Sequence, residues 1–190
     1  HELKYAGYDL ITITGSSDKP VYLLVDDDNV ELKDASHLWG EMTYKTQRLV
    51  KEELGDEKFQ VACIGPAGEN KVRITSVIHN VRASGRGGIG AVLGSKKLKA
   101  IAVRGSKKVQ VADVGGLIEF HKEMIEESKI ATAKYMKYGT TSTLGFVNSV
   151  GGLGTRNWQT EVFEGSEKIT GETTLPKYKV KETSCAACTI

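Results

Sequence analysis

Glycine and cationic residues gather in one run of this sequence. Between Arg82 and Ala100 there are five glycines, two arginines and three lysines. Glycine lets backbone N–H groups approach a bound oxyanion and adopts backbone angles that other residues avoid. Arginine adds a planar fork of donors that matches the oxygens of phosphate. The run therefore predicts a site for a ligand that carries phosphate.

The same run matches the common nucleotide-binding motifs poorly. It lacks the spacing of a mononucleotide P-loop. Gly85, Gly87 and Gly90 match the pattern Gly-x-Gly-x-x-Gly, but the residues around them do not fit the motif. A dinucleotide-binding fold needs a strand before the pattern, a long helix after it and an acidic residue about twenty positions on. Asp113 lies too far along, and strand-like residues 99–104 follow too soon. A glycine-rich turn packed closely against a neighbouring strand is the alternative interpretation.

Cysteine provides a second candidate site. Cys185 and Cys188 form a Cys-x-x-Cys pair, which by itself is compatible with half of a metal or cluster site, a redox-active pair or a chance spacing. Cys63 lies in the apolar run of residues 61–64 and is predicted to be a small buried side chain. An odd number of cysteines argues against a disulfide framework and indicates a reducing compartment.

Several stretches together resemble the tungsten-containing aldehyde:ferredoxin oxidoreductase family. The resemblance is carried by Gly-Pro-Ala-Gly-Glu-Asn at 65–70, by the glycine-rich run at 82–96 and by Leu-Lys-Ala-Ile-Ala-Val-Arg-Gly at 98–105. Further matches are Leu-Lys-Tyr-Ala-Gly-Tyr-Asp at 3–9 and Asp-Ala-Ser-His-Leu-Trp-Gly at 34–40. The resemblance covers the whole chain and is strongest over its first 105 residues or so.

The resemblance implies a cofactor in which two pterin dithiolenes hold one tungsten or molybdenum, with a magnesium ion bridging the pterin phosphates. The backbone carbonyl of Ala83 is the implied magnesium ligand, and Arg82, Ser84 and Gly85 are implied to line the pterin and its phosphate. Magnesium prefers oxygen ligands and phosphates, which suits this assignment. Weaker candidates for a phosphate contact are Arg86, Lys96 and Lys99. Two polar residues of the upstream motif, Glu69 and Asn70, are predicted to organise the turn.

The family also binds a 4Fe-4S cluster through Cys-x2-Cys-x3-Cys and a distant fourth cysteine. Cys185 and Cys188 match the first two positions, and the third would fall beyond Ile190. A four-thiolate cluster would then need cysteines outside these 190 residues. Together with the absence of an initiator methionine at His1, this leads us to expect a piece of a longer chain. The family's acid and base groups would lie in the remainder, so no catalytic side chain is assigned.

The implied reaction oxidises an aldehyde with water to a carboxylic acid and passes two electrons through the cluster to ferredoxin. The metal centre carries such chemistry, while the protein binds and orients. A homodimer is implied by the family alone. Two alternatives remain: a benzoyl-CoA-reductase-type subunit on the same scaffold, and a non-catalytic fragment. Two residues depart from the family pattern: Ser84 stands where several relatives have alanine, and Lys97 where many have asparagine. These departures weaken the assignment of the substrate class more than that of the cofactor.

Composition indicates a globular protein: 39% of the residues are hydrophobic and the net charge is +2. Positive charge is local and has no interleaved aromatic residues, which argues against a nucleic-acid partner. No apolar run approaches the roughly eighteen residues of a membrane span, and no leader is recognisable. We therefore expect no membrane partner and a cytoplasmic location.

Turn signals and β-branched residues predict short strands at 9–15, 21–26, 30–33, 59–64, 71–79 and 99–104. One helix is predicted at 43–54, with apolar residues on one face. This pattern predicts an α+β domain over residues 1–109, with a mostly antiparallel sheet and few helices.

From Asp113, a predicted helix N-cap, the hydrophobic period becomes that of a helix. Residues 130–137 and a stretch ending at 147 continue the helical pattern. Residues 151–160 are predicted to form an irregular glycine-rich loop, and 161–181 an exposed connector. We therefore expect residues 110–190 to begin an all-α, iron–sulfur-binding domain.

Overall fold

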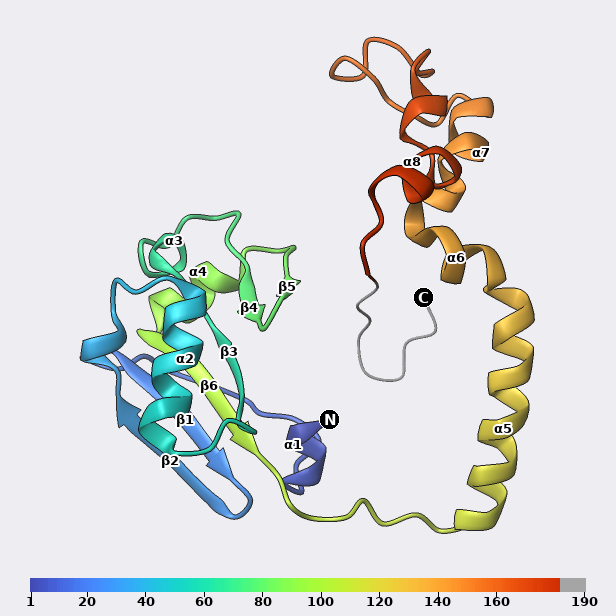
Figure 1. Ribbon diagram of the computed structural model, residues 1–190. Helices are drawn as coiled ribbons and strands as arrows, with labels where there is room; N and C mark the ends of the chain where they lie inside the picture. Colours follow the sequence, from blue (N-terminus) through green and yellow to red (C-terminus); the bar gives the residue numbers. More distant parts are fainter. Residues whose placement is uncertain (182–190) are drawn as a thin grey trace. The chain divides into compact units, whose positions relative to one another are not determined.

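The computed structural model of this protein describes residues 1–181 (Figure 1). The chain divides into two compact units, with the boundary between Gln110 and Val111. Within the described residues, all named strands lie in the first unit, and the second unit is built from helices and loops. The predicted class, an α+β sheet domain followed by a helical region, is confirmed.

The first unit is built on one six-stranded sheet. Its strands are β1 (Val21–Asp26), β2 (Asn29–Asp34), β3 (Gln60–Cys63), β4 (Val77–His79), β5 (Arg82–Ser84) and β6 (Leu98–Arg104). Their order in space is β2-β1-β6-β3-β4-β5. All neighbouring pairs are antiparallel except β1 and β6, which are parallel. The prediction of a mostly antiparallel sheet is confirmed.

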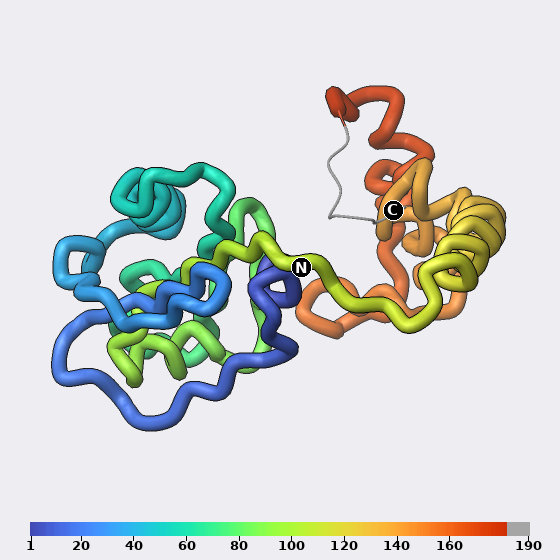
Figure 2. The backbone as a smooth tube through the Cα atoms, turned by 90° about the horizontal axis from the view of Figure 1, so that it is seen from below, coloured from blue at the N-terminus to red at the C-terminus, as the bar shows by residue number. Residues whose placement is uncertain are grey.

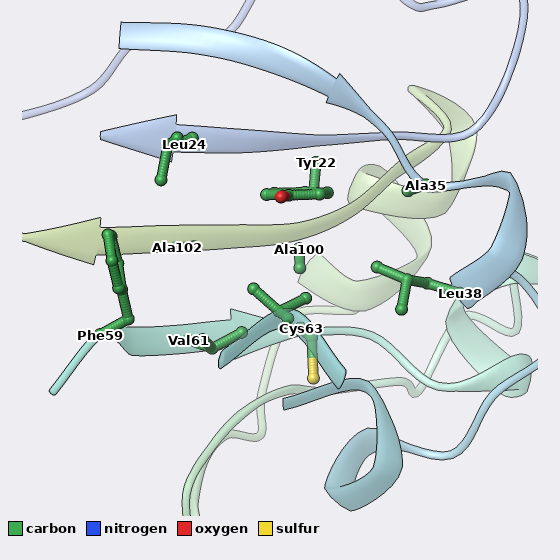
Figure 3. Close-up of a cluster of buried hydrophobic side chains, with 10 residues drawn as sticks. Tyr22, Leu24, Ala35, Leu38, Phe59, Val61, Cys63, Ala100 and Ala102 are labelled. Carbon is green, nitrogen blue, oxygen red and sulfur yellow. The ribbon is translucent and has the colours of Figure 1, made fainter. Parts of the chain in front are cut away.

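Both faces of the central strands are buried. Alternate residues of a strand point to opposite faces, and β1 contributes Tyr22 and Leu24 to one hydrophobic cluster and Val21, Leu23 and Val25 to another. Figure 3 shows the first cluster, which gathers side chains from β1, β3, β6 and the segment after β2. A strand covered on both faces reads as a continuous apolar run, which explains the sequence of β1.

Helices cover the two faces. On one face lies α2 (Thr43–Leu54), whose Val50 is fully buried in the first cluster. On the other lie α1 (Glu2–Tyr5), the extended residues after it and α4 (Ile89–Ser95), which contribute Leu3, Ile11 and Leu93 to the second cluster. Figure 2 shows α2 and α4 on opposite sides of the strands. The remaining helices of this unit are η1 (Ser36–Leu38) and α3 (Pro66–Glu69).

Two predicted strands are wrong in whole or in part. Residues 9–15 form no strand, because Ile11 and Ile13 pack on a face of the sheet while the segment pairs with no strand edge. Of the predicted strand 71–79, only β4 exists. The residues before it form turns, beginning at Lys71, whose φ is +58°.

The second unit begins with α5 (Val114–Ala131). Its predicted cap is confirmed: the Asp113 carboxylate accepts the backbone N–H of Gly116 at 2.9 Å. Short helical elements follow: α6 (Ala133–Tyr138), η2 (Gly139–Thr143), α7 (Leu144–Ser149), η3 (Ser166–Ile169) and α8 (Gly171–Tyr178).

The prediction of an exposed connector over 161–181 is wrong, because η3 and α8 lie within it. The Thr170 hydroxyl accepts the Thr173 N–H and so caps α8. The Asn148 side chain also bonds to the backbone of Phe163 and to Ser166. These contacts order a segment whose polar composition resembles that of a linker.

Candidate functional site

Three of the predicted cofactor residues, Arg82, Ala83 and Ser84, form β5 of a short hairpin at one edge of the sheet. β4 and β5 pair antiparallel with His79 opposite Arg82, Ile78 opposite Ala83 and Val77 opposite Ser84. Asn80 and Val81 form the turn between the strands, and Asn80 has a φ of +50°. Asparagine tolerates this left-handed conformation better than most residues do. An asparagine in a two-residue turn between β-formers was therefore a sequence signal for this hairpin, which the predicted strands did not include.

The register of the hairpin sets the direction of the Ala83 carbonyl. A two-residue hairpin turn closes with a hydrogen bond between the residues that flank it, here His79 and Arg82. Hydrogen-bonded and non-hydrogen-bonded pairs alternate along an antiparallel ladder, so Ile78 and Ala83 form a non-hydrogen-bonded pair. The N–H and C=O of Ala83 consequently point away from β4, toward the edge of β5 where no described strand pairs (Figure 1).

The side chains around this edge are open to solvent. Arg82, Ala83 and Ser84 are all exposed. An added Cβ at Gly85 would meet only the Ser76 hydroxyl oxygen, at 3.7 Å, which is an ordinary van der Waals contact. Neither packing nor a positive φ therefore requires glycine at position 85. Around the Cβ position of residue 85, the protein itself therefore leaves the space open apart from this one contact.

Three later glycines of the run, Gly88, Gly90 and Gly94, serve packing instead. An added Cβ would come within 2.3 Å of the Arg73 carbonyl oxygen at Gly88, 2.6 Å of the Ser76 carbonyl oxygen at Gly90 and 1.9 Å of the Gly68 carbonyl oxygen at Gly94. Gly90 and Gly94 let α4 approach the backbone of α3 and of the segment before β4. The close-packing interpretation thus holds for the second half of the run, and Gly85 lies outside it.

The ammonium groups of the three lysines of the run all donate hydrogen bonds within the protein. The Lys96 and Lys97 ammonium groups donate to the carbonyl oxygens of Gly15 at 2.9 Å and Asp18 at 2.5 Å. Lys99 is fully buried. The suggestion that Lys96 and Lys99 contact phosphate is therefore not favoured. Arg86, by contrast, lies exposed in the loop between β5 and α4.

Lys99, near the end of the run, forms a buried ion pair with Glu69 of α3. The Lys99 ammonium donates to a Glu69 carboxylate oxygen and, at 2.8 Å, to the Glu41 carbonyl oxygen. Both carboxylate oxygens of Glu69 also accept the Gly40 N–H, at 2.9 and 3.0 Å. The Asn70 amide donates to the Pro66 carbonyl at 2.8 Å. Glu69 and Asn70 thus organise local structure, as predicted from their place in the motif.

Of the three cysteines, only Cys63 lies within the residues that the structure describes. Cys63 is fully buried, as predicted, and burial raises the pKa of its thiol to about 12. Cys185 and Cys188, the predicted cluster ligands, lie outside the described residues. Among residues 1–181 no three or more His, Cys, Asp or Glu side chains gather as a metal site.

None of the helices in the described part of the chain combines the length and the apolar composition needed to cross a membrane.

Two family descriptions match the sequence. Residues 1–105 match "Aldehyde ferredoxin oxidoreductase, N-terminal domain", and residues 117–190 match "Aldehyde ferredoxin oxidoreductase, domains 2 & 3". The whole chain is 50% identical to a tungsten-containing aldehyde ferredoxin oxidoreductase of Pyrococcus abyssi and 49% identical to the protein of that description from Pyrococcus horikoshii. The chain spans about a third of the length of these curated relatives, 32% of each.

A solved structure is also similar. It is described as the active site complex BamBC of benzoyl coenzyme A reductase in complex with 1,5-dienoyl-CoA, and it matches with a TM-score of 0.77 and 35% identity. The match covers 98% of this chain and 31% of the other. The sequence matches, which extend over both units, show that the chain belongs to the aldehyde ferredoxin oxidoreductase family.

Proposed function

We propose that this chain is part of a tungsten- or molybdenum-containing oxidoreductase that converts aldehydes to carboxylic acids. One aldehyde and one water give one carboxylic acid, two protons and two electrons. The observation that carries the proposal is the open edge at Ala83 and Gly85, on a chain whose relatives are tungsten enzymes. The electrons would leave through a 4Fe-4S cluster to ferredoxin.

The hairpin edge fits the phosphate end of a pterin cofactor. The outward carbonyl of Ala83 offers magnesium an oxygen ligand, and magnesium commonly takes its other ligands from phosphates and water. Arg82 is placed to donate hydrogen bonds to the phosphate, and Ser84 offers a hydroxyl donor on the same strand. The gap at Gly85 admits the ligand to the backbone. When bound, the bis-pterin metal centre supplies the two-electron redox chemistry, and these residues bind and orient it.

The cluster would take two thiolates from this chain. Cys185 and Cys188 have the spacing of the first two cluster ligands in the family. The remaining ligands, and the acid and base groups that serve the substrate, would come from the part of the protein that the curated relatives have and these residues do not span. A homodimer and a cytoplasmic location complete the proposal.

The likeness to the benzoyl-CoA reductase complex favours a second candidate. On that alternative the chain belongs to a subunit that reduces an aromatic ring carried on coenzyme A. The two candidates share the pterin-supporting hairpin and differ in the electron direction and in the substrate cavity. Turnover with aldehydes and an oxidised viologen, compared with turnover of an aromatic acyl-CoA and a strong reductant, separates them.

Metal analysis of the full-length protein is the direct test. We expect tungsten or molybdenum, magnesium and about four irons per polypeptide, together with viologen reduction by aldehydes. Arg82→Gln should lower the content of tungsten and magnesium, while the matched control Lys108→Gln, which removes an exposed cation outside the run, should not. A folded full-length protein without tungsten, molybdenum or iron would overturn the proposal and favour a non-catalytic role.

A further inference from the structure

A buried amide of α2 reaches the tip of the cofactor hairpin. The Gln47 residue is only 6% exposed, and its side-chain oxygen accepts the backbone N–H of Asn80 at 2.7 Å. These residues lie 33 positions apart in the sequence. Asn80 is the turn residue with a φ of +50°. The bond therefore connects the helix that packs on the sheet to the turn that leads into Arg82.

A second contact holds the same turn from β3. The Gln60 side-chain oxygen lies 3.1 Å from Nε2 of His79 and accepts the Asn80 amide at 3.4 Å. With Gln60 as the acceptor, Nε2 of His79 carries the proton. Together, the Gln47 and Gln60 carbonyl oxygens hold the turn from two different elements.

The hairpin needs such anchors because its strands are short. β4 and β5 have three residues each, and β5 pairs with β4 alone among the described strands. β4 in turn pairs with β3 at only two positions. A two-stranded hairpin is marginally stable by itself. A change in the turn would therefore move Arg82 and the Ala83 carbonyl, which follow it directly.

We propose that Gln47 is a positioning residue for the pterin and magnesium site: its side-chain carbonyl holds the turn of the β4–β5 hairpin, so that Arg82 and the Ala83 carbonyl are pre-set for the cofactor. The cofactor part of this inference rests on the proposed function. Pre-organised groups bind more tightly because they lose less freedom on binding.

The second polar atom of Gln47 supports this role. Its Nε2 is buried without a hydrogen-bond partner among the described residues, and a buried donor without a partner disfavours the folded state. An apolar side chain of similar size would pack at this position without that cost. The amide oxygen, which meets the hairpin, is therefore the part of Gln47 that contributes specifically.

Gln47→Met is the informative variant, because it removes both the acceptor and the partnerless donor while keeping the volume. Two variants accompany it. Thr46→Val changes the preceding buried residue of α2, whose hydroxyl bonds to Glu41 and not to the hairpin. Gln47→Glu keeps the acceptor and places a carboxylate one helical turn before Lys51.

The experiment measures hydrogen exchange and metal content in the full-length protein. In Gln47→Met, we expect amides of residues 77–85 to exchange about three- to tenfold faster, the range for losing one hydrogen bond, while β1 and β6 amides keep their rates. We also expect less tungsten and magnesium per polypeptide. Thr46→Val should resemble the parent protein in both measurements, and Gln47→Glu should restore slow exchange in the hairpin.

Two results would overturn the inference. Unchanged hairpin exchange in Gln47→Met would show that the bond does not hold the turn. Faster exchange with unchanged tungsten and magnesium would show that the bond is structural only. A parent protein that contains neither metal would contradict the proposed function instead, and the exchange measurement would still decide whether Gln47 holds the hairpin.

Discussion

The Lys99 ammonium and the Glu69 carboxylate form an ion pair that solvent barely reaches, with side chains 0% and 5% exposed. Through this pair, β6 is connected to α3, and the same two groups bond to the backbone at Gly40 and Glu41. α3 is also the surface against which Gly94 lets α4 pack. The pair therefore supports α3, the helix against which α4 packs.

Removing one partner of this pair should be costly. Lys99→Met leaves the Glu69 carboxylate buried without its counter-ion, a change that typically costs about 3–5 kcal/mol. The double variant Lys99→Met with Glu69→Leu removes both charges and should recover much of that loss. Native-state hydrogen exchange of β6 amides in the intact protein measures both effects. Additive losses in the double variant would show that the two groups act independently.

Gly85→Ala should separate cofactor binding from folding. The added methyl group meets only the Ser76 hydroxyl oxygen in the protein, at 3.7 Å, so the melting temperature of cofactor-free protein should hardly change. On the proposed function, the methyl group would obstruct the approach of the cofactor to the backbone at residue 85, so tungsten and magnesium content should fall. Gly145→Ala in α7, whose added methyl group meets nothing within 4 Å, is the control. Equal metal content in both variants would contradict a ligand at position 85.

Gly94→Ala should instead disturb folding. Its Cβ would lie 1.9 Å from the Gly68 carbonyl oxygen, so α3 and α4 must move apart. Overpacking of this kind costs about 1–3 kcal/mol and should lower the melting temperature with or without cofactor. Val92→Ala, at a half-exposed position of the same helix, is the matched comparison. If Gly94→Ala melts at the temperature of the parent, the close approach of the two helices is not required.

Cys63 should be unreactive in the folded protein. Burial raises the pKa of its thiol to about 12, and the thiolate is the form that reacts with alkylating reagents. Iodoacetamide at pH 8 should leave the Cys63 peptide unmodified in native protein and label it after denaturation, as read by mass spectrometry. Rapid labelling in native protein would contradict the buried position.

Asp34 should contribute to acid sensitivity. Hydrogen bonds from Lys19 and from the Ser36 N–H lower the pKa of this carboxyl from 3.8 to about 2. Because the folded pKa is the lower one, the stabilisation is present above about pH 4 and is lost as pH falls toward 2. Asp34→Asn should therefore be less stable than the parent at pH 6, and the difference should shrink between pH 4 and 2. Parallel stability curves would show that Asp34 has no such role.

Much of the architecture could be predicted from local pattern. The continuous apolar run of β1 indicates a strand buried on both faces, and the N-cap at Asp113 predicts the start of α5. The prediction of a strand at 9–15 was wrong, because a segment with alternating apolar side chains can pack across the face of a sheet without pairing with one of its strands. The prediction also missed α8, because its segment is polar in composition. Its cap at Thr170 is local, but the preceding η3 is held by Asn148, which is distant in the sequence.

The sequence by itself predicted a phosphate-carrying ligand for the run of residues 82–100 and carried the resemblance to a pterin enzyme family, because both depend on residue types and their order. Only the tertiary structure decided how the glycines and cations of the run divide their roles. Gly94 serves packing and Lys99 a buried ion pair, whereas Gly85 stays open. Such roles depend on which distant backbone or carboxylate lies opposite each residue, and spacing along the chain does not contain that information.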